Sequence, residues 1–398
     1  MKILQINATC EHGSTGLVVK DIGNALEKAG DEVFYAYQLA RNPIKNGYRV
    51  GNLLDWKVHA LFSRLFGKQA YFSKSSTKKL LKWMDSLQPD IVHLHNLHSN
   101  YINLNMVLEY LAKMKIPTVI TLHDCWYFTG KCFHYVDIGC DGFKYGCKNC
   151  SDKNGAPVSW LFNTAASVYK DRVKYLFEIE NLKIVGCSQW ITDEAKKGFL
   201  KDFDVRRIRN GVNTEIFTQQ NKEQIKEKHN LTGKYVILGI AEKWMVPSNK
   251  NLISRIVKGL DDNSVFIMLG CTDVQKEYLR SFGDKMITHS FVEHRHTMAE
   301  YYCMADVFVN ASHADTLPTV SMESICCGTP VITYNNSGCP ELVLDGCGIV
   351  VDDYNEDEFI KAIETVKATK YDCSKIGAEN FDKNKLVQNY IDLYREMI

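Results

Sequence analysis

Short apolar runs alternate with longer amphipathic stretches along the whole of this 398-residue chain. Short apolar runs bounded by polar turns are typical of buried strands, and the stretches between them carry apolar residues at helical spacing. This alternation predicts an α/β protein, with parallel sheets covered by helices. The runs that we expect to form strands fall into two series: Lys2–Ile6, Asp31–Tyr37, Ile91–His95, Thr118–Thr121 and Leu182–Val185, then Tyr235–Ile240, Val265–Leu269, Val307–Asn310, Pro330–Thr333 and Gly348–Val350.

Two such series predict two doubly wound, Rossmann-like parallel-sheet domains that face a central cleft at the carboxyl ends of their strands. The polar segment between about 203 and 227 is the best candidate for the linker. We therefore expect an N-terminal domain over residues 1–208 and a second domain over 209–378. Residues 379–398 are predicted to hold a C-terminal helix that packs back on the N-terminal domain.

Composition restricts the classes of function. The formal net charge of +1 argues against a protein that binds nucleic acid through bulk electrostatics. No apolar run approaches the roughly 18 residues that a membrane-spanning helix needs. Fourteen cysteines without a recognisable export signal indicate a reducing compartment, in which thiols stay free or bind metal. We expect a cytoplasmic protein.

The stretch Asp315-Thr-Leu-Pro-Thr-Val-Ser-Met-Glu323 carries the clearest chemistry. It follows a strand-like run and predicts a strand end, a turn and a helix, with Pro318 at the first helical position and Gly328 as the left-handed residue that closes it. The N-terminus of a helix favours anions. Carboxylates repel phosphates, so Asp315 and Glu323 are expected to accept hydrogen bonds from hydroxyls instead. A diphosphate with hydroxyl groups on both sides is the chemical pattern of a sugar nucleotide, so the stretch predicts a site for such a ligand.

These motifs together resemble those of the retaining glycosyltransferases of family four, which have the GT-B architecture. The spacing of Asp315 and Glu323 matches the Glu-x7-Glu motif of that family, although the first acid is usually Glu. Further matches run through the chain: Arg209-Asn-Gly-Val-Asn213 with Phe217, Cys327-Gly-Thr-Pro-Val331, Gly338-Cys-Pro-Glu341, Ile91-Val-His-Leu-His-Asn96 and Thr121-Leu-His-Asp124.

The resemblance implies transfer of a sugar from a nucleotide diphosphate sugar to a hydroxyl acceptor, with retained configuration and without a catalytic metal or other cofactor. The acceptor is expected to be a glycan or lipid-linked molecule, in the synthesis of capsule, another cell-surface polysaccharide or a glycoconjugate. Lys250 aligns with the lysine that such enzymes place on the phosphates, and Lys243 is a second candidate. Glu323 is expected to hold the ribose and Asp315 the transferred sugar. The remaining donor-site candidates are small or turn residues: Gly13, Gly16, Thr316, Leu317 and Thr319.

Histidines at two strand ends of the first half are the candidates for the acceptor side. His123, with Asp124 beside it, fits the family position that contacts the transferred sugar. His93 and His95 point to the same face, because alternate residues of a strand do so. His95, His98 and Asp124 are candidates for binding the acceptor, and the alternative is that the histidines are satisfied core residues.

The insert 125–150 contains Cys132, Cys140, Cys147 and Cys150. Four thiolates suit tetrahedral zinc, and the final C-x2-C pair has metal-binding spacing. The quartet therefore predicts a structural zinc site, or alternatively a set of reduced cysteines packed under aromatic side chains.

Residues 56–84 hold seven Lys or Arg and no acidic residue, interspersed with aromatic residues. This combination suits the surface of an anionic membrane, which would place the protein at the inner face of the cell membrane. The alternative is an ordinary basic helix pair that covers the sheet.

Two other functions fit parts of the pattern. A nicotinamide oxidoreductase also has Rossmann domains, but the Gly-x-Gly-x-x-Gly fingerprint is missing after the first strand. A non-catalytic protein that binds sugar nucleotides or glycans is the alternative that the unusual Asp315 leaves open.

Overall fold

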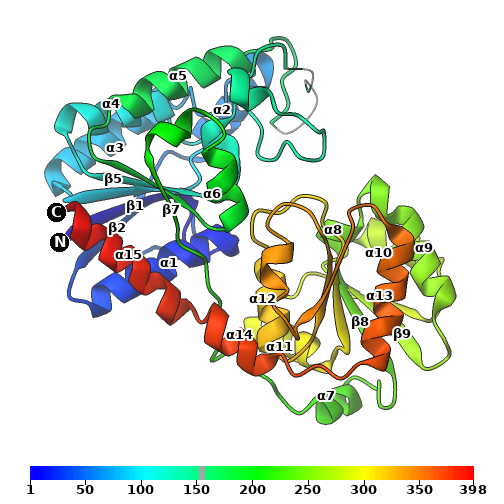
Figure 1. The fold of residues 1–398 in the computed structure, drawn as a ribbon. Coiled ribbons are helices and arrows are strands. Elements are labelled where there is room, and N and C mark those ends of the chain that lie inside the picture. Colours follow the sequence, from blue (N-terminus) through cyan, green and yellow to red (C-terminus); the bar gives the residue numbers. More distant parts are fainter. Residues whose placement is uncertain (151, 153–156) are drawn as a thin grey trace. The chain divides into compact units, whose positions relative to one another are not determined.

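The computed structural model describes residues 1–150, 152 and 157–398. The chain divides into two compact units, which comprise residues 1–210 with 386–398 and residues 211–385. Each unit is a parallel β-sheet with helices on both faces (Figure 1).

In the described part of the first unit, the sheet has seven parallel strands in the order β3-β2-β1-β4-β5-β6-β7. Their bounds are β1 Lys2–Thr9, β2 Glu32–Leu39, β3 Gly47–Arg49, β4 Ile91–Leu94, β5 Thr118–Leu122, β6 Leu182–Gly186 and β7 Asp204–Arg207. Strands β1 to β3 follow one another towards one edge of the sheet, and strands β4 to β7 follow one another towards the other edge. The order therefore reverses between β1 and β4, which pair directly. In doubly wound sheets such a reversal leaves a crevice at the carboxyl ends of the strands, where ligands bind.

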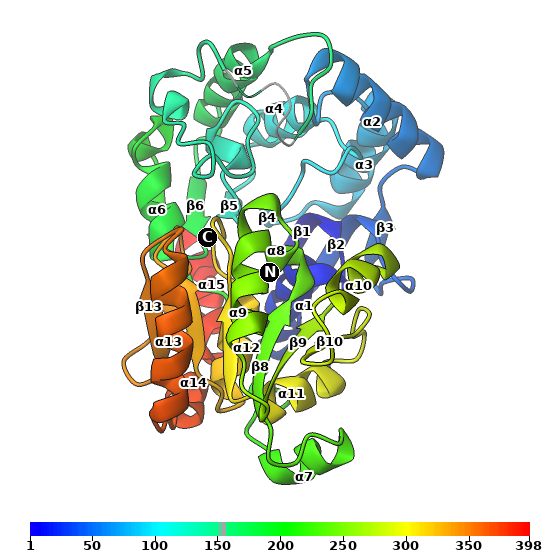
Figure 2. The same cartoon turned by 90° about the vertical axis from the view of Figure 1, so that its right-hand side faces the viewer.

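Helices cover both faces of this sheet. Their bounds are α1 Gly13–Lys28, α2 Leu53–Phe66, α3 Lys74–Leu87, α4 Leu104–Met114, α5 Ala165–Phe177, α6 Gln189–Ala195 and α15 Lys383–Met397, with short 3-10 turns η1 Trp126–Phe128, η2 Gly142–Tyr145 and η3 Phe199–Asp202. Apolar residues of α1 and α15 form one buried cluster with strand residues, and α3, α4 and α5 lie on the opposite face. Helices α2 and α3 lie next to each other (Figure 2). His59 Nδ1 of α2 is 2.7 Å from the Oγ of Ser73, the residue before α3.

The second unit repeats this plan. Among its described residues the sheet order is β10-β9-β8-β11-β12-β13, and the direction reverses between β8 and β11. The strands are β8 Tyr235–Ile240, β9 Ser264–Leu269, β10 Met286–Thr288, β11 Val307–Asn310, β12 Val331–Tyr334 and β13 Gly348–Val351. The helices are α7 Lys222–Lys228, α8 Ala241–Trp244, α9 Lys250–Gly259, α10 Asp273–Arg280, α11 Arg295–Met304, α12 Thr319–Cys326, α13 Glu356–Ala368 and α14 Ser374–Phe381, with 3-10 turns η4 Pro247–Asn249 and η5 Pro340–Leu342.

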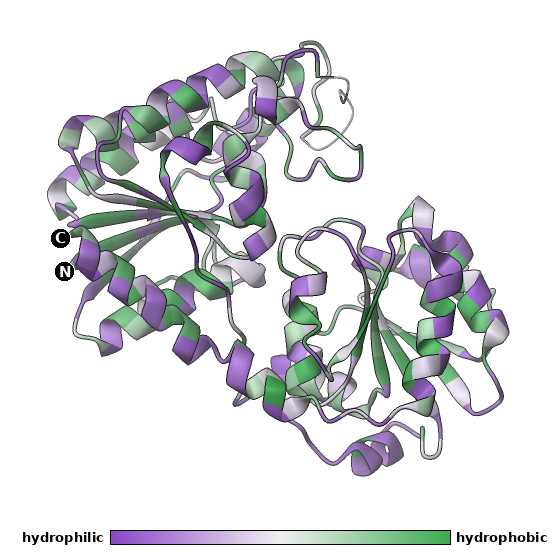
Figure 3. Ribbon diagram, in the orientation of Figure 1, coloured by the Kyte–Doolittle hydropathy of each residue, from purple (hydrophilic) through white to green (hydrophobic). Residues whose placement is uncertain are grey.

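The central strands carry the cores of both units. Their residues are buried on both faces, and the strands are mostly hydrophobic, whereas the covering helices alternate in hydropathy (Figure 3). Strands buried on both sides are expected to be apolar throughout, because helices cover each face of a parallel sheet. The apolar runs in the sequence therefore identified these strands directly.

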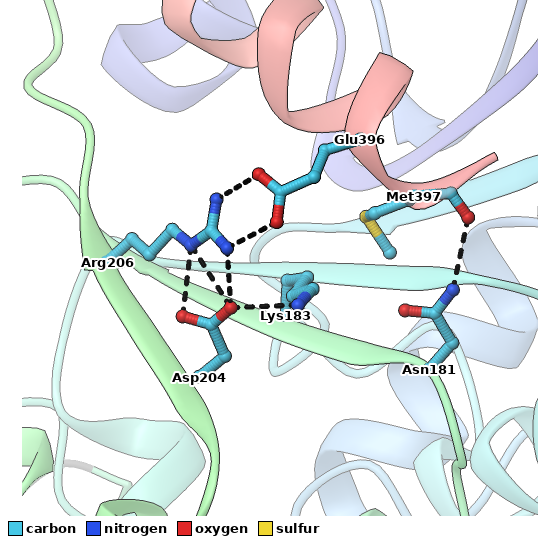
Figure 4. Close-up of polar contacts among 6 residues, drawn as sticks. All are labelled: Asn181, Lys183, Asp204, Arg206, Glu396 and Met397. Carbon is cyan, nitrogen blue, oxygen red and sulfur yellow. Dashed lines mark hydrogen bonds and ion pairs between the residues drawn. The ribbon is translucent and has the colours of Figure 1, made fainter.

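Polar contacts at one edge of the first sheet hold the C-terminal helix in place (Figure 4). The guanidinium of Arg206 on β7 pairs with Asp204 at 2.7 Å and with Glu396 of α15 at 2.6 Å. The Nδ2 of Asn181 donates to the carbonyl oxygen of Met397 at 3.2 Å. These contacts attach residues 386–398 to the first unit, although they follow the second unit in the chain.

Two details differ from the expectations of the sequence, and a third agrees with them. Leu182–Gly186 is not the last strand of its sheet, because β7 follows it within the segment that we took for the linker. Pro318 is the residue before the helix, with an extended backbone (φ −70°, ψ 96°), so α12 begins at Thr319. Gly328 has a positive φ of 86° after the end of α12, as predicted.

Candidate functional site

Lys243 and Asp315 lie together at the carboxyl ends of the two strands where the second sheet reverses. Lys243 follows β8 in the short helix α8, and Asp315 follows β11. The Lys243 ammonium is 3.1 Å from the Asp315 carboxylate. Burial lowers the pKa of Lys243, but the Asp315 carboxylate outweighs this and holds the pKa above its ordinary value. The lysine is therefore a permanent cation next to the start of α12.

The loop that carries Asp315 is fixed by backbone contacts. The Asp315 side chain accepts a hydrogen bond from the Leu317 N–H at 3.2 Å, and the Gly338 N–H donates to the Asp315 carbonyl at 2.9 Å. A Cβ atom at Gly338 would lie 1.9 Å from the Thr316 carbonyl oxygen, so only glycine fits there. The side chains of Thr316 and Leu317 are buried, and Thr319 is the first residue of α12.

Glu323 lies about one turn into α12 in an enclosed position. Its side chain is 16% exposed, and it accepts a hydrogen bond from the Tyr302 hydroxyl at 3.2 Å. Burial raises the pKa of Glu323 to about 7, against the opposing effect of Arg295, whose guanidinium is 4.0 Å away. A carboxylate in this position can accept two hydroxyl hydrogen bonds. No motif pointed to Tyr302 or Arg295, because their contact with Glu323 exists only in the fold.

Lys250 occupies a different place from Lys243. It is the first residue of α9, and its ammonium lies 5.9 Å from the centre of the Tyr278 ring. Within the described residues it forms no ion pair with Asp315. The preceding Asn249 is buried and donates to the carbonyl oxygens of Lys243 and Ala311 at 2.9 and 2.8 Å. The sequence ranked Lys250 first, whereas the structure brings Lys243 to Asp315. The phosphate contact of Lys250 stays a prediction.

Histidines form a connected group at the corresponding ends of β4 and β5 in the first unit. The rings of His93 and His95 are 3.9 Å apart, as expected for alternate residues of one strand. His95 Nδ1 lies 3.0 Å from His123 Nε2, and its Nε2 lies 3.2 Å from the Gln5 amide oxygen. His95 is completely buried, and through this contact it holds the ring of His123, which is partly exposed.

Burial lowers the pKa of His123 to about 4, although the neighbouring Asp124 opposes the shift. This ring is therefore neutral at physiological pH and can both donate and accept a hydrogen bond. His98 lies 2.9 Å from the Asp124 carboxylate, which also accepts from the Trp126 N–H at 2.9 Å. Burial raises the pKa of Asp124, but His98 outweighs this and lowers it below the ordinary value.

A buried polar chain links the C-terminal helix to these histidines. The Tyr394 hydroxyl lies 2.6 Å from His93 Nδ1, and Thr121 Oγ1 lies 2.7 Å from His93 Nε2 and 3.0 Å from the Tyr390 hydroxyl. The two contacts of the C-terminal helix join residues that are 301 and 269 positions apart along the chain, so sequence patterns gave no signal for them. The polar chain fixes the ring of His93 and hence the position of β4.

The glycine turn after β1 has two separate functions in the fold. A Cβ at Gly16 would lie 2.8 Å from Thr9 Oγ1, so Gly16 allows α1 to pack closely on the strand end. Gly13 begins α1 with a positive φ of 67° and has open space around its Cα. An approaching ligand would therefore meet Gly13 without a side chain in the way.

The cysteine insert folds onto the buried guanidinium of Arg172. This group lies 4.0 Å from the centre of the Trp126 ring and donates to the carbonyl oxygens of Trp126 and Thr129. The Gly130 N–H donates to Cys147 Sγ at 3.1 Å. Burial, with the nearby thiols of the quartet, raises the pKa of Cys132 to about 12. Among the residues that the structure describes, no three His, Cys, Asp or Glu side chains are grouped to hold a metal ion. Zinc binding by Cys132, Cys140, Cys147 and Cys150 stays a prediction.

Two family models match the chain. The model of glycosyltransferase family 4 matches residues 15–216, and that of the glycosyl transferases group 1 matches residues 249–383. The putative colanic acid biosynthesis glycosyl transferase WcaC of Escherichia coli K12 is 22% identical over the full length of both chains. The spore coat protein SA of Bacillus subtilis is 22% identical over 45% of this chain and 53% of its own length.

Solved structures share the fold. The sucrose-phosphate synthase of Thermosynechococcus elongatus superposes with a TM-score of 0.70 at 16% identity, over 100% of this chain and 98% of its own. Anabaena Alr3699/HepE, solved in complex with UDP-glucose, superposes with a TM-score of 0.66 at 13% identity, over the whole of both chains. The predicted GT-B class, built from two Rossmann-like parallel-sheet domains, is confirmed.

Proposed function

Because the chain belongs to glycosyltransferase family 4, we propose that it transfers a sugar from a nucleotide diphosphate sugar to a hydroxyl acceptor, with retention of configuration. The observation that carries this proposal is the arrangement of Lys243, Asp315 and Glu323 around the start of α12. The relationship to WcaC supports a role in polysaccharide or glycoconjugate synthesis.

The donor diphosphate is proposed to bind between the N-terminus of α12 and the ammonium of Lys243. The first N–H groups of a helix have no acceptor within it, and the helix dipole adds partial positive charge there. For α12 these groups are the N–H groups of Thr319 and Val320, because the Ser321 N–H already donates to the Pro318 carbonyl at 3.0 Å. The Asp315–Leu317 loop leads directly to them. Positive charge placed in advance stabilises the departing nucleotide, which is the largest demand of the reaction.

The two acids bind the hydroxyls on either side of the diphosphate. Glu323 is proposed to accept from the ribose hydroxyls, and its neighbour Tyr302 orients the carboxylate. Asp315 is proposed to accept from the transferred sugar while it pairs with Lys243. The UDP and UDP-glucose complexes of Alr3699/HepE support a nucleotide sugar as the donor.

The acceptor is proposed to bind near His123, with His98 and Asp124 as polar contacts. In the transfer step, a bond forms from the acceptor oxygen to the anomeric carbon and the bond from that carbon to the phosphate oxygen breaks. The acceptor proton passes to the departing phosphate oxygen, so no dedicated protein base and no catalytic metal are required. A neutral His123 can both donate a hydrogen bond to a sugar hydroxyl and accept one from it.

Donor turnover by the purified chain tests the proposal. We expect nucleoside diphosphate release from a panel of nucleotide sugars, and a loss of at least about tenfold in kcat/KM for Lys243→Ala and Glu323→Gln, since each removes a charge-assisted contact. The exposed residues Lys258 and Glu277 of the same unit provide matched control variants, Lys258→Ala and Glu277→Gln, which should keep full activity. Binding of a nucleotide sugar without any turnover would instead indicate a non-catalytic binding protein.

A further inference from the structure

Helix α2 turns its apolar side chains outward. The residues that it buries are His59, Ala60 and Ser63, which are polar or small. Two of its large apolar residues, Trp56 and Leu65, are half-buried. The others are between 38% and 70% exposed: Leu53, Leu54, Val58, Leu61, Phe62 and Phe66. A surface helix of a globular protein normally shows the opposite pattern, with the apolar stripe facing the core. The apolar side of α2 is therefore suited to contact a partner outside the chain.

A second segment extends this surface. Val158, Trp160, Leu161 and Phe162 are also exposed, with Trp160 at 57% and Leu161 at 65%. The Trp160 N–H donates to the Arg64 carbonyl at 2.7 Å, and the rings of Phe66 and Phe162 stack 5.9 Å apart. Of the twenty large apolar residues exposed in the described part of the chain, ten lie in these two segments. We call these ten residues the α2 patch.

The α2 patch adjoins a large cavity. The cavity has a volume of about 820 Å³, and its apolar lining includes Phe66 and Phe162 of the patch together with Tyr71, Phe72 and Tyr175. Lys68 and Lys74 also line it. Contiguous exposed apolar surface of this kind marks an interaction site for protein or membrane.

Charge distinguishes between the candidate partners. Residues 56–84 carry seven basic and no acidic side chains, and in the described part of the chain none of the seven forms an ion pair with a carboxylate. A symmetric pairing of two copies through α2 would bring these like charges together. An anionic lipid surface would instead attract the basic residues that lie near it. The structure describes no helix that is long and apolar enough to cross a bilayer.

We propose that the α2 patch docks on the surface of an anionic lipid bilayer. In this arrangement α2 lies in the plane of the interface, with Leu54, Leu61 and Trp160 inserted at the boundary between headgroups and acyl chains. The basic side chains of α2 and α3 then contact the lipid headgroups. The docking does not depend on the proposed glycosyl transfer, since it requires no nucleotide sugar.

Co-sedimentation of the full chain with vesicles tests this proposal. The vesicles are made of phosphatidylcholine, with or without the anionic lipid phosphatidylglycerol. We expect binding to the anionic vesicles, and a loss of more than about tenfold in the triple variant Leu54→Ser/Leu61→Ser/Trp160→Ser, which removes the three apolar side chains proposed to insert into the bilayer. The control variant Val274→Ser/Phe291→Ser removes apolar residues that are 79% and 76% exposed in the other unit, and should bind normally.

Charge and self-association provide two further measurements. Lys57→Gln and Arg64→Gln should each weaken binding to anionic vesicles about fivefold, and added salt should weaken it further. Failure of the unaltered chain to bind anionic vesicles, or equal binding of the triple variant, would overturn the proposal. A dimer in solution that dissociates in the triple variant would also overturn it, because the patch would then belong to a second copy of the chain.

Discussion

The ammonium of Lys243 lies 3.1 Å from the carboxylate of Asp315, at the ends of the neighbouring strands β8 and β11. An arriving diphosphate therefore meets a lysine whose charge is already shared with an acid. The short side chain of Asp315 keeps that acid at the lysine, and its other oxygen accepts from the Leu317 N–H. In the proposed function this pair meets two demands, because Lys243 attracts the phosphates while Asp315 holds the transferred sugar.

Substitution of Asp315 should separate these demands. In Asp315→Asn the lysine loses its competing carboxylate, so we expect nucleoside diphosphate to bind several-fold more tightly. We expect kcat to fall at the same time by about tenfold or more, because the sugar loses a charge-assisted acceptor. Calorimetric titration with nucleoside diphosphate and steady-state kinetics measure the two effects. Weaker binding by Asp315→Asn would show that the acid does not compete with the phosphates.

Stability should depend on pH through Glu323. Burial raises the pKa of this carboxyl from its ordinary 4.5 to about 7, so between these values the folded protein binds more protons than the unfolded chain. The free energy of unfolding contributed by Glu323 is therefore full below pH 4.5 and falls as the pH rises towards 7, by at most about 3 kcal/mol. Urea unfolding of the wild type and Glu323→Gln across this range measures the difference. Parallel curves for the two proteins would contradict the raised pKa.

Donor affinity should change with pH in the opposite direction. In the proposed site the ribose hydroxyls donate to the ionised Glu323 carboxylate, so binding of nucleoside diphosphate should strengthen as the pH rises through about 7. Glu323→Gln should bind more weakly and without this dependence on the carboxyl. Titrations at several pH values, with Glu277→Gln as the control, measure the effect.

Gly338 tests how closely the loop at Asp315 must pack. In Gly338→Ala the new methyl would lie 1.9 Å from the Thr316 carbonyl oxygen, which forces the loop to move. A shift of about 1 Å at a reacting centre can cost about a hundredfold in rate, so we expect a large loss of kcat/KM. Gly259→Ala is the matched control, because a Cβ there has no atom within 4 Å. Normal kinetics in Gly338→Ala would show that the loop at Asp315 does not contribute to the donor site.

The buried chain from α15 to the histidines should contribute to stability. Tyr394→Phe removes the hydroxyl that contacts His93 Nδ1, and leaves a fully buried ring nitrogen without that partner. We expect a loss of about 1–3 kcal/mol in the free energy of unfolding. Denaturant unfolding of Tyr394→Phe, His93→Phe and the double variant measures the coupling. Strict additivity of the two changes would show that the contact contributes nothing.

Hydrophobic pattern predicted the central strands because those strands are buried on both faces. It missed the edge strands β3, β7 and β10, which have three or four residues. In β7, for example, the sequence Asp204-Val-Arg-Arg207 is mostly polar, since one side of an edge strand faces solvent. Such segments pair only because a neighbouring strand is already in place.

The candidate site could be predicted where its residues are close in sequence. Asp315 and Glu323 stand on one turn and helix, so their spacing was informative. Tyr302 and Tyr394 reach their partners only after the sheets have formed, and no local pattern identifies them. The choice between Lys243 and Lys250 likewise depends on how the chain turns after β8, which the sequence does not specify.

A crystal structure with bound nucleoside diphosphate tests the central claim most directly. The account predicts the pyrophosphate at the first turn of α12, within hydrogen-bond distance of Lys243, and the ribose hydroxyls on the Glu323 carboxylate. A nucleotide bound to any other part of the chain, with Lys243 still on Asp315 and Glu323 without a ribose, would contradict it.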